Sequence, residues 1–166
     1  MKDIRGKVAI ITGSGTGVGA ATARLLAAQG CHVVINYSRS ADAAVQVASA
    51  CERLGVEMLM CKANVASDVE CRAMVDQALK KWGHVDIVVN NAGTTKFCEH
   101  SDLEGLDAQD FQSIYAVNVI GPYQMIRAAA AAMQSQEQGG VVVNVASTAA
   151  ITVVGSSVAY AASKGS

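Results

Sequence analysis

Residues 7–19 read KVAIITGSGTGVG, an apolar run that stops in a cluster of glycines. The β-branched run from Lys7 to Thr12 is typical of a strand that is buried on both faces of a sheet. Beyond the glycines, Val18 to Ala28 has apolar residues at helical spacing and is followed by Gly30, a residue suited to a left-handed helix end. A strand, a glycine-rich turn and a helix in this order predict the first unit of an α/β fold.

The same alternation continues through the rest of the chain. Further strands are expected at 32–37, 57–61, 85–90 and 140–145, and further helices at 41–54, 67–82, 108–134 and from about 157 onward. Strands that alternate with helices over short connections require crossovers, and crossovers produce a parallel sheet with helices on both faces. We therefore expect one doubly wound α/β domain over residues 1–166.

The composition narrows the class of protein. The chain carries 13 Lys+Arg and 14 Asp+Glu, a formal net charge of -1, and 51% of its residues are hydrophobic. This balance gives neither the basic surface of a nucleic-acid-binding protein nor the excess charge of a disordered one. No apolar run approaches the roughly 20 residues that cross a membrane. The five cysteines form no CxxC pair and the three histidines are scattered, so we expect no disulfide framework, no metal site and a reducing, cytoplasmic location.

The position of the glycine cluster between a strand and a helix suggests its chemistry. Glycines there let backbone N–H groups approach a pyrophosphate at the helix N-terminus, where unpaired donors and the helix dipole favour negative charge. A flexible turn that binds nothing is the alternative, but the position after the first buried strand favours dinucleotide binding. The expected contacts are Gly13, Ser14, Thr16, Gly17, Val18 and Gly19.

Ser147, Tyr160 and Lys164 form a second constellation. Tyr160 and Lys164 are four residues apart at the start of the last expected helix, so they share a face and the ammonium can approach the phenol. Ser147 follows the fifth strand, at the carboxyl edge of the sheet, where ligands bind in open α/β folds. A cation beside the phenol favours its ionised form, as acid–base chemistry near neutral pH requires. An exposed helix face is the alternative, but a place opposite the glycine loop favours catalysis.

Five motifs in this order resemble the short-chain dehydrogenase/reductase family in its single-domain form. They are Thr12-Gly-x-x-x-Gly-x-Gly19, Asn90-Asn91-Ala92-Gly93, Asn118, Ser147 and Tyr160-x-x-x-Lys164. The resemblance spans essentially the whole chain and implies a Rossmann fold. It also implies an oxidoreductase, similar to 3-oxoacyl-carrier-protein reductases and glucose dehydrogenases, that transfers a hydride between NADP(H) and a carbonyl or secondary alcohol.

The resemblance further implies a role for each matching residue. Tyr160 would exchange a proton with the substrate oxygen, Ser147 would hydrogen-bond that oxygen, and Lys164 would favour ionisation of Tyr160 and hold the nicotinamide ribose. Asn118 would position a water in the proton relay. The cofactor would also contact Asn91, Ala92, Gly93, Asn64 and Val65, although the family commonly has Asp-Val where this chain has Asn64-Val65.

The end of the second expected strand bears on the choice of coenzyme. NAD-specific sites place an Asp or Glu there to bind the ribose hydroxyl, and that carboxylate repels the 2'-phosphate of NADP. This chain has Tyr37 instead, followed by Ser38 and Arg39, a hydroxyl and a guanidinium suited to phosphate. Thr16 stands where many NADP-dependent relatives have a basic residue. We expect NADP as the coenzyme, with NAD as the alternative.

Two other functions share some of these features. A dinucleotide-binding module or sensor without turnover would keep the glycine loop but has no need of Asn118, Ser147, Tyr160 and Lys164. Epimerisation or dehydration on the same scaffold usually goes with a longer substrate lobe and a differently spaced glycine loop. The intact set of polar residues therefore favours an oxidoreductase acting on a small carbonyl or alcohol substrate.

Two expectations concern assembly and completeness. The long helix at 108–134 carries more apolar residues than one sheet face can cover, and the family resemblance points to a homotetramer built as a dimer of dimers. The chain supplies five strands where this fold has six. We expect the sheet to be cut off after the fifth strand and the start of the next helix, with the fifth strand as an exposed edge and the C-terminal portion missing.

Overall fold

The computed structural model describes residues 3–166. The strands are β1 (Val8–Ile11), β2 (His32–Tyr37), β3 (Met58–Lys62), β4 (Ile87–Asn90) and β5 (Val141–Asn144). The helices are α1 (Gly17–Ala28), α2 (Ala41–Glu52), α3 (Asp68–Trp82), α4 (Ala108–Tyr115), the π-helix η1 (Ala116–Ile120), α5 (Gly121–Ser135), α6 (Ala149–Thr152) and α7 (Val158–Lys164). The expected alternation of strands and helices is confirmed, and the single turn α6 is an addition to it.

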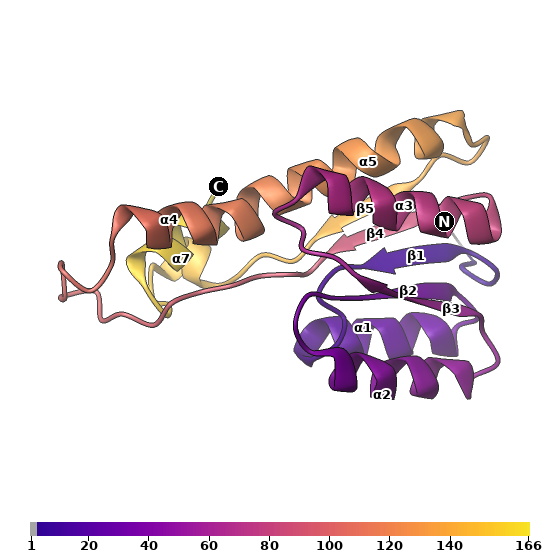
Figure 1. The fold of residues 1–166 in the computed structure, drawn as a ribbon, viewed down its shortest axis with the longest axis horizontal. Coiled ribbons are helices and arrows are strands. Elements are labelled where there is room, and N and C mark those ends of the chain that lie inside the picture. The colour runs from indigo at the N-terminus through magenta and orange to yellow at the C-terminus, as the bar shows by residue number, and fades with distance from the viewer. Residues whose placement is uncertain (1–2) are drawn as a thin grey trace.

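The five strands form one parallel sheet with the order β3-β2-β1-β4-β5. Helices α1 and α2 cover one face of the sheet, and α3 and α5 cover the other (Figure 1). The chain first adds β2 and β3 on one side of β1, and then returns to add β4 and β5 on the other side. Because all crossovers have the same hand, the two directions place helices on opposite faces of the sheet. The predicted doubly wound, Rossmann-like sheet is confirmed.

The core fills the two spaces between the sheet and its helix layers. All four residues of β1 are fully buried, because this strand lies between two others and beneath helices on both faces. On one face the sheet packs against small residues of α1 and α2, and on the other it packs against Met74 of α3 and Met125 of α5. Continuous burial on both faces explains why β1 is an unbroken apolar run rather than an alternating one.

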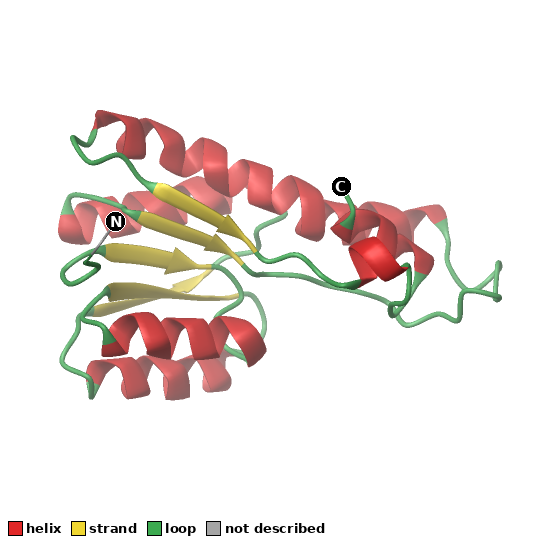
Figure 2. Ribbon diagram, turned by 180° about the vertical axis from the view of Figure 1, so that it is seen from behind, coloured by secondary structure: helices red, strands yellow, loops and turns green. Residues whose placement is uncertain are grey.

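The outer strand β5 is much more open than the strands inside the sheet. Val141, Val142 and Val143 are 42%, 37% and 46% exposed, and within residues 3–166 β5 pairs only with β4. Its position at the rim of the sheet is visible from behind (Figure 2). The expected exposed edge at the fifth strand is confirmed.

A lobe made of α4, α6 and α7 extends beyond the carboxyl ends of the strands (Figure 1). Helix α7 packs against α4, α6 and η1. Its first turn is capped by the Ser157 hydroxyl, which accepts a hydrogen bond from the Tyr160 N–H at 3.2 Å. The lobe therefore holds the Tyr160–Lys164 turn next to the edge of the sheet where ligands bind.

The long helix expected at 108–134 is present but contains a π-helical segment in its middle. In that segment the Gly121 N–H bonds to the Ala116 carbonyl, five residues back instead of four. Pro122 follows at once, and it lacks the N–H that would pair with the Asn118 carbonyl in an α-helix. The π-helical segment therefore loses no α-helical hydrogen bond at the Asn118 carbonyl, because Pro122 could not donate one.

Candidate active site

The glycine loop between β1 and α1 requires glycine for steric reasons. Gly13 has a φ of 63°, and a Cβ atom there would lie 2.9 Å from the Ala92 Cα. At Gly19, a Cβ atom would lie 2.6 Å from the Gly13 carbonyl oxygen. Both positions thus allow only a hydrogen in place of a side chain, and the loop can press directly against the segment that follows β4.

Hydrogen bonds lock the glycine loop to that segment. The Thr12 hydroxyl accepts hydrogen bonds from the N–H groups of Asn91 and Ala92, each at 3.0 Å. In return, the Asn91 side-chain amide donates to the carbonyls of Thr12 at 2.9 Å and Gly13 at 3.2 Å. The glycine loop and the segment after β4, which were expected to contact the cofactor independently, therefore form one rigid unit.

Asn36 is a structural residue of the site that the sequence reasoning missed. It is 2% exposed, accepts a hydrogen bond from the Gly13 N–H at 2.9 Å, and donates to the carbonyls of Cys61 and Ala63. One side chain thus ties the ends of β1, β2 and β3 together. An asparagine inside the apolar run VVINY was the available signal, since a buried amide needs partners for all its polar atoms.

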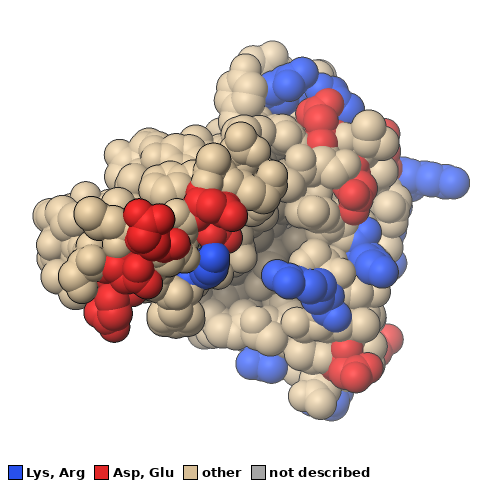
Figure 3. All heavy atoms as spheres, turned by 60° about the vertical axis from the view of Figure 1, so that its left-hand side comes forward, with Lys and Arg blue, Asp and Glu red and all other residues tan. Residues whose placement is uncertain are grey.

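A cavity of about 790 Å³ opens along the carboxyl ends of β1 to β4. Figure 3 shows the hollow, with basic side chains on one rim and acidic ones gathered on the lobe. Most of the expected cofactor contacts line it, namely Gly13, Thr16, Gly17, Val18, Ser38, Arg39, Asn64, Val65, Asn91, Ala92 and Gly93. Ser14 and Gly19 are buried and lie outside the lining. Lys62 and Glu70 line the cavity as well, and the sequence reasoning had assigned neither.

Asn118 stands in the π-helical segment and is 7% exposed. Its Oδ1 accepts a hydrogen bond from the Thr94 N–H at 2.8 Å, and its Nδ2 donates to the Thr94 carbonyl at 3.0 Å and to the Ser163 hydroxyl at 2.9 Å. Both amide hydrogens are used, so a further partner can bind only at Oδ1. Asn118 thereby joins the loop after β4 to helix α7.

Lys164 and Ser147 are held close to this junction. The Lys164 ammonium donates to the Val145 carbonyl at 2.9 Å, which anchors α7 to the end of β5. A Cβ atom built on Gly93 would lie 3.7 Å from the Lys164 Nζ and 3.5 Å from the Asn118 Oδ1. Ser147 begins the turn into α6, where its hydroxyl accepts a hydrogen bond from the Ala149 N–H at 3.2 Å. Lys164 and Asn118 thus lie against Gly93, which lines the larger cavity. The cavity lining itself includes none of the expected catalytic residues Asn118, Ser147, Tyr160 and Lys164.

A second, smaller cavity of about 540 Å³ lies in the lobe. Its walls come from residues 97–100 in the loop after β4 and residues 153–156 in the loop before α7, which the Cys98 N–H joins by a hydrogen bond to the Ser156 carbonyl at 2.9 Å. Val153 holds a left-handed backbone conformation with a φ of 59°, a strained one for a β-branched residue.

The residues around the larger cavity fit a dinucleotide. Gly13 lines the cavity, and the N-terminus of α1 faces it through Thr16, Gly17 and Val18. Unpaired N–H groups at a helix N-terminus suit a pyrophosphate. Among residues 3–166, no group of three or more His, Cys, Asp or Glu side chains is placed to hold a metal ion. The fold is a doubly wound α/β sheet, and the cavity at the carboxyl ends of its strands is suited to a dinucleotide.

Comparison with known proteins gives the family. The family model for short chain dehydrogenases matches residues 7–166, and the chain belongs to this family. The 3-hydroxyacyl-CoA dehydrogenase type-2 of Bos taurus is 35% identical over 172 residues, covering 99% of this chain and 64% of that protein.

Two solved structures are similar to the chain. One is a short-chain dehydrogenase/reductase of Burkholderia xenovorans, with a TM-score of 0.93 and 41% identity over 96% of this chain and 67% of that one. The other is an NAD+-bound xylitol dehydrogenase, with a TM-score of 0.90 and 29% identity over 99% of this chain and 62% of that one. The chain thus spans about three fifths to two thirds of the length of these relatives. None of the helices in the described part of the chain has the length and apolar character needed to cross a membrane.

Proposed function

We propose that the complete protein is an oxidoreductase that transfers a hydride between NADP(H) and a carbonyl or secondary alcohol. One observation carries the proposal. The Lys164 ammonium and the Asn118 amide lie against Gly93, a residue that lines the cavity suited to a dinucleotide, and helix α7 holds Tyr160 and Lys164 one turn apart. A non-catalytic nucleotide binder has no use for this arrangement.

Each residue then has a defined task. The coenzyme, when bound, supplies or accepts the hydride at the substrate carbon. In reduction, Tyr160 gives its phenolic proton to the carbonyl oxygen, so that a C–H bond and an O–H bond form together. Ser147 donates a hydrogen bond to the same oxygen, and the Lys164 ammonium supports the phenolate that remains. Asn118 holds the Thr94 backbone and α7 in register and offers Oδ1 to a relay water.

The preference for NADP over NAD rests on the end of β2. Tyr37 occupies the position where an acidic residue would repel the 2'-phosphate, and the exposed Ser38 and Arg39 line the cavity immediately after it. A guanidinium is suited to a phosphate because it offers several N–H donors in a fixed plane.

The complete protein is proposed to act in the cytoplasm as a homotetramer, a dimer of dimers. Four of its cysteines are buried as free thiols, in keeping with a reducing compartment. Ile120 and Tyr123, at the junction of η1 and α5, are 47% and 61% exposed. These apolar side chains offer a contact surface to a second copy.

The test is the substitution Tyr160→Phe in the complete protein. It removes the proton donor and leaves the ring, so we expect turnover of a ketone panel with NADPH to fall by at least about 100-fold, while NADPH binding stays unchanged. Tyr115→Phe, which removes a hydroxyl from a half-buried ring at the end of α4, is the matched control and should keep full turnover. Near-normal turnover of the Tyr160 variant would refute the catalytic assignment, and coenzyme binding without turnover by the wild type would favour a sensor.

A further inference from the structure

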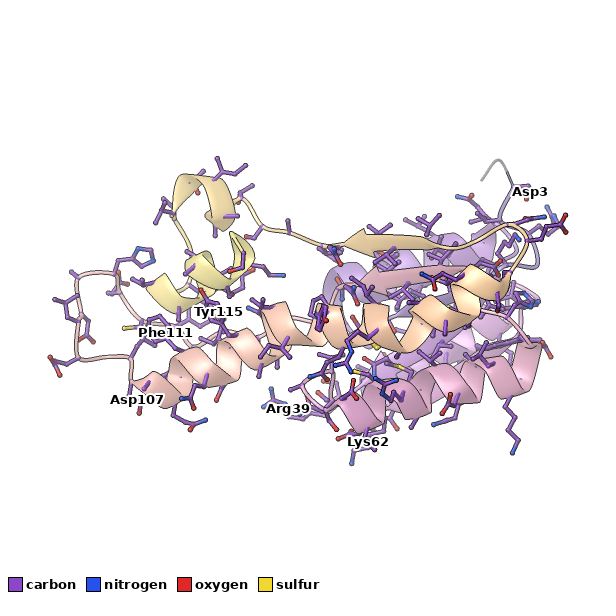
Figure 4. The ribbon with its side chains drawn as sticks, turned by 90° about the horizontal axis from the view of Figure 1, so that it is seen from above. Asp3, Arg39, Lys62, Asp107, Phe111 and Tyr115 are labelled. Carbon is purple, nitrogen blue, oxygen red and sulfur yellow. The ribbon has the colours of Figure 1, made fainter. Side chains whose placement is uncertain are left out.

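Two basic residues contribute to the lining of the larger cavity, Lys62 at the end of β3 and Arg39 in the loop after β2. Tyr37 and Lys62 are register partners at the ends of β2 and β3, and Arg39 lies two residues beyond Tyr37. Lys62 and Arg39 both line the cavity. Viewed from above, the two side chains stand near each other at the carboxyl edge of the sheet (Figure 4).

Neither cation has a partner within the part of the chain that the structure describes. Lys7, Arg72, Lys96 and Arg127 form ion pairs with carboxylates, whereas no ion pair and no side-chain hydrogen bond of Arg39 or Lys62 occurs among residues 3–166. The cavity is thus lined by two cationic side chains that form no ion pair with any carboxylate of residues 3–166.

Two carboxylates lie in the same neighbourhood, and neither neutralises this pair. Asp42 belongs to the first turn of α2, where it is favourably placed against the helix dipole. Glu70 lines the cavity, but its Oε2 accepts a hydrogen bond from the Asn64 N–H at 2.8 Å. Glu70 is therefore held at the turn after β3 and forms no ion pair with Arg39 or Lys62, so both cations can bind an external anion.

We propose that Lys62 is a second ligand, alongside Arg39, for the 2'-phosphate of NADP(H), and a determinant of coenzyme choice. The inference rests on the proposed function. A phosphate monoester carries close to two negative charges near neutral pH and has three acceptor oxygens, so it can bind a guanidinium and an ammonium together. Lys62 compensates for the absence of a basic residue at Thr16 by approaching the phosphate from β3 instead of from the glycine loop.

The experiment measures dissociation constants of NADPH and NADH by calorimetry for the complete protein and three variants. Lys62→Met removes the charge and keeps a long side chain, and Lys62→Arg retains the charge. Lys80→Met removes the same charge from the last turn of α3, at the opposite edge of the sheet, and serves as the matched control. We expect Lys62→Met to weaken NADPH binding about tenfold, as the loss of one charge-assisted hydrogen bond would, and to change NADH binding less than twofold.

The accompanying results separate the alternatives. Lys62→Arg should restore most of the NADPH affinity, Lys80→Met should leave both constants unchanged, and added salt should weaken NADPH binding less in Lys62→Met than in the wild type. Equal weakening of NADPH and NADH would overturn the inference, because it would assign Lys62 to the shared part of the coenzyme or to folding. Unchanged NADPH binding would overturn it too. The proposed NADP preference fails separately, if the wild type binds NADH more tightly than NADPH.

Discussion

Strands β4 and β5 have nearly the same sequence, IVVN and VVVN, and opposite environments. They pair in register from Ile87 with Val141 to Asn90 with Asn144. All four residues of β4 are buried, and all four residues of β5 are exposed. The difference shows that a short apolar run specifies a strand, whereas its burial depends on the neighbours that the rest of the chain provides.

The contrast extends from the two strands to the two regions around them. The region from β1 to β4 has helices on both faces and contains nearly the whole lining of the larger cavity. The region from α4 onward contributes Asn118, Ser147, Tyr160 and Lys164, and it is joined to the first region by contacts such as the bond from Lys164 to the Val145 carbonyl. The proposed coenzyme binding therefore depends on an enclosed region, and the proposed catalysis depends on a more open lobe.

The largest expected effect is on thiol reactivity. Burial raises the pKa of the Cys31 thiol to about 12 and that of Cys71 to about 11, and it also raises the pKa values of Cys51 and Cys61. For Cys31 this lowers the reactive thiolate fraction about a thousandfold. Cys98, in the lobe, is half-buried. Titration of the native protein with an aromatic disulfide should give one fast thiol, and the other four should react only after unfolding.

The control for the thiol experiment is Cys98→Ser, which should abolish the fast phase. If a fast thiol remained in that variant, the region from β1 to β4 would open more readily than its burial suggests. The contrast between the two regions would then be wrong.

A smaller effect is expected from one substitution made at two paired positions. Val88 is fully buried and its register partner Val142 is 37% exposed. Val88→Ala should lower the free energy of unfolding by about 2 to 3 kcal/mol, because it removes buried methyl groups and leaves a cavity. Val142→Ala should cost less than about 1 kcal/mol, because its side chain already contacts solvent. Urea denaturation of the 166-residue chain provides both values.

The same pair of variants sharpens the comparison in the complete protein. If residues outside this chain cover β5, the cost of Val142→Ala rises there toward that of Val88→Ala. If Val88→Ala and Val142→Ala lowered the free energy of unfolding of the 166-residue chain by the same large amount, the open position of β5 would be contradicted.

The smallest expected effect is electrostatic. In the lobe, the hydrogen bond from the Lys96 ammonium, supported by the Asp107 N–H, holds the pKa of the Asp110 carboxyl below its usual value of 3.8. A carboxyl with a lowered pKa in the folded state stabilises the fold above its unfolded pKa, and this contribution is lost as the pH falls through the folded pKa. Lys96→Met should raise the pKa of Asp110 toward the usual value, as carboxyl NMR titration can measure. An unchanged midpoint would show that the ion pair is not formed in solution.

Much of the fold was predictable because it follows from local patterns. The buried apolar runs, the glycine loop and the stop at Gly83, which has a φ of 80°, each reflect a constraint that acts over a few residues. The order of the sequence motifs also indicated that most of the expected cofactor contacts would line one cavity, since the carboxyl ends of parallel strands share one edge of the sheet.

What the sequence reasoning missed depends on contacts between distant segments. Asn36 looks like an ordinary strand residue until Gly13 and Ala63 come within hydrogen-bond distance of its amide. Lys62 becomes a cavity residue only because β3 lies beside β2 in a particular register. The π-helical segment depends on Pro122 and on the place of Asn118 against Thr94, and neither shows in an apolar periodicity.

The π-helical segment acts as a phase shift in the helix from Ala108 to Ser135. Each residue of an α-helix turns by about 100°, so deleting one residue from 116–120 to restore regular α-helix would rotate everything that follows by that angle relative to α4. Met125, Ala129 and Met133, now buried against the sheet, would then face away from it. A helical wheel drawn through the whole segment assigns these residues to the wrong face, and a peptide designed to copy this helix needs a separate wheel on each side of Asn118.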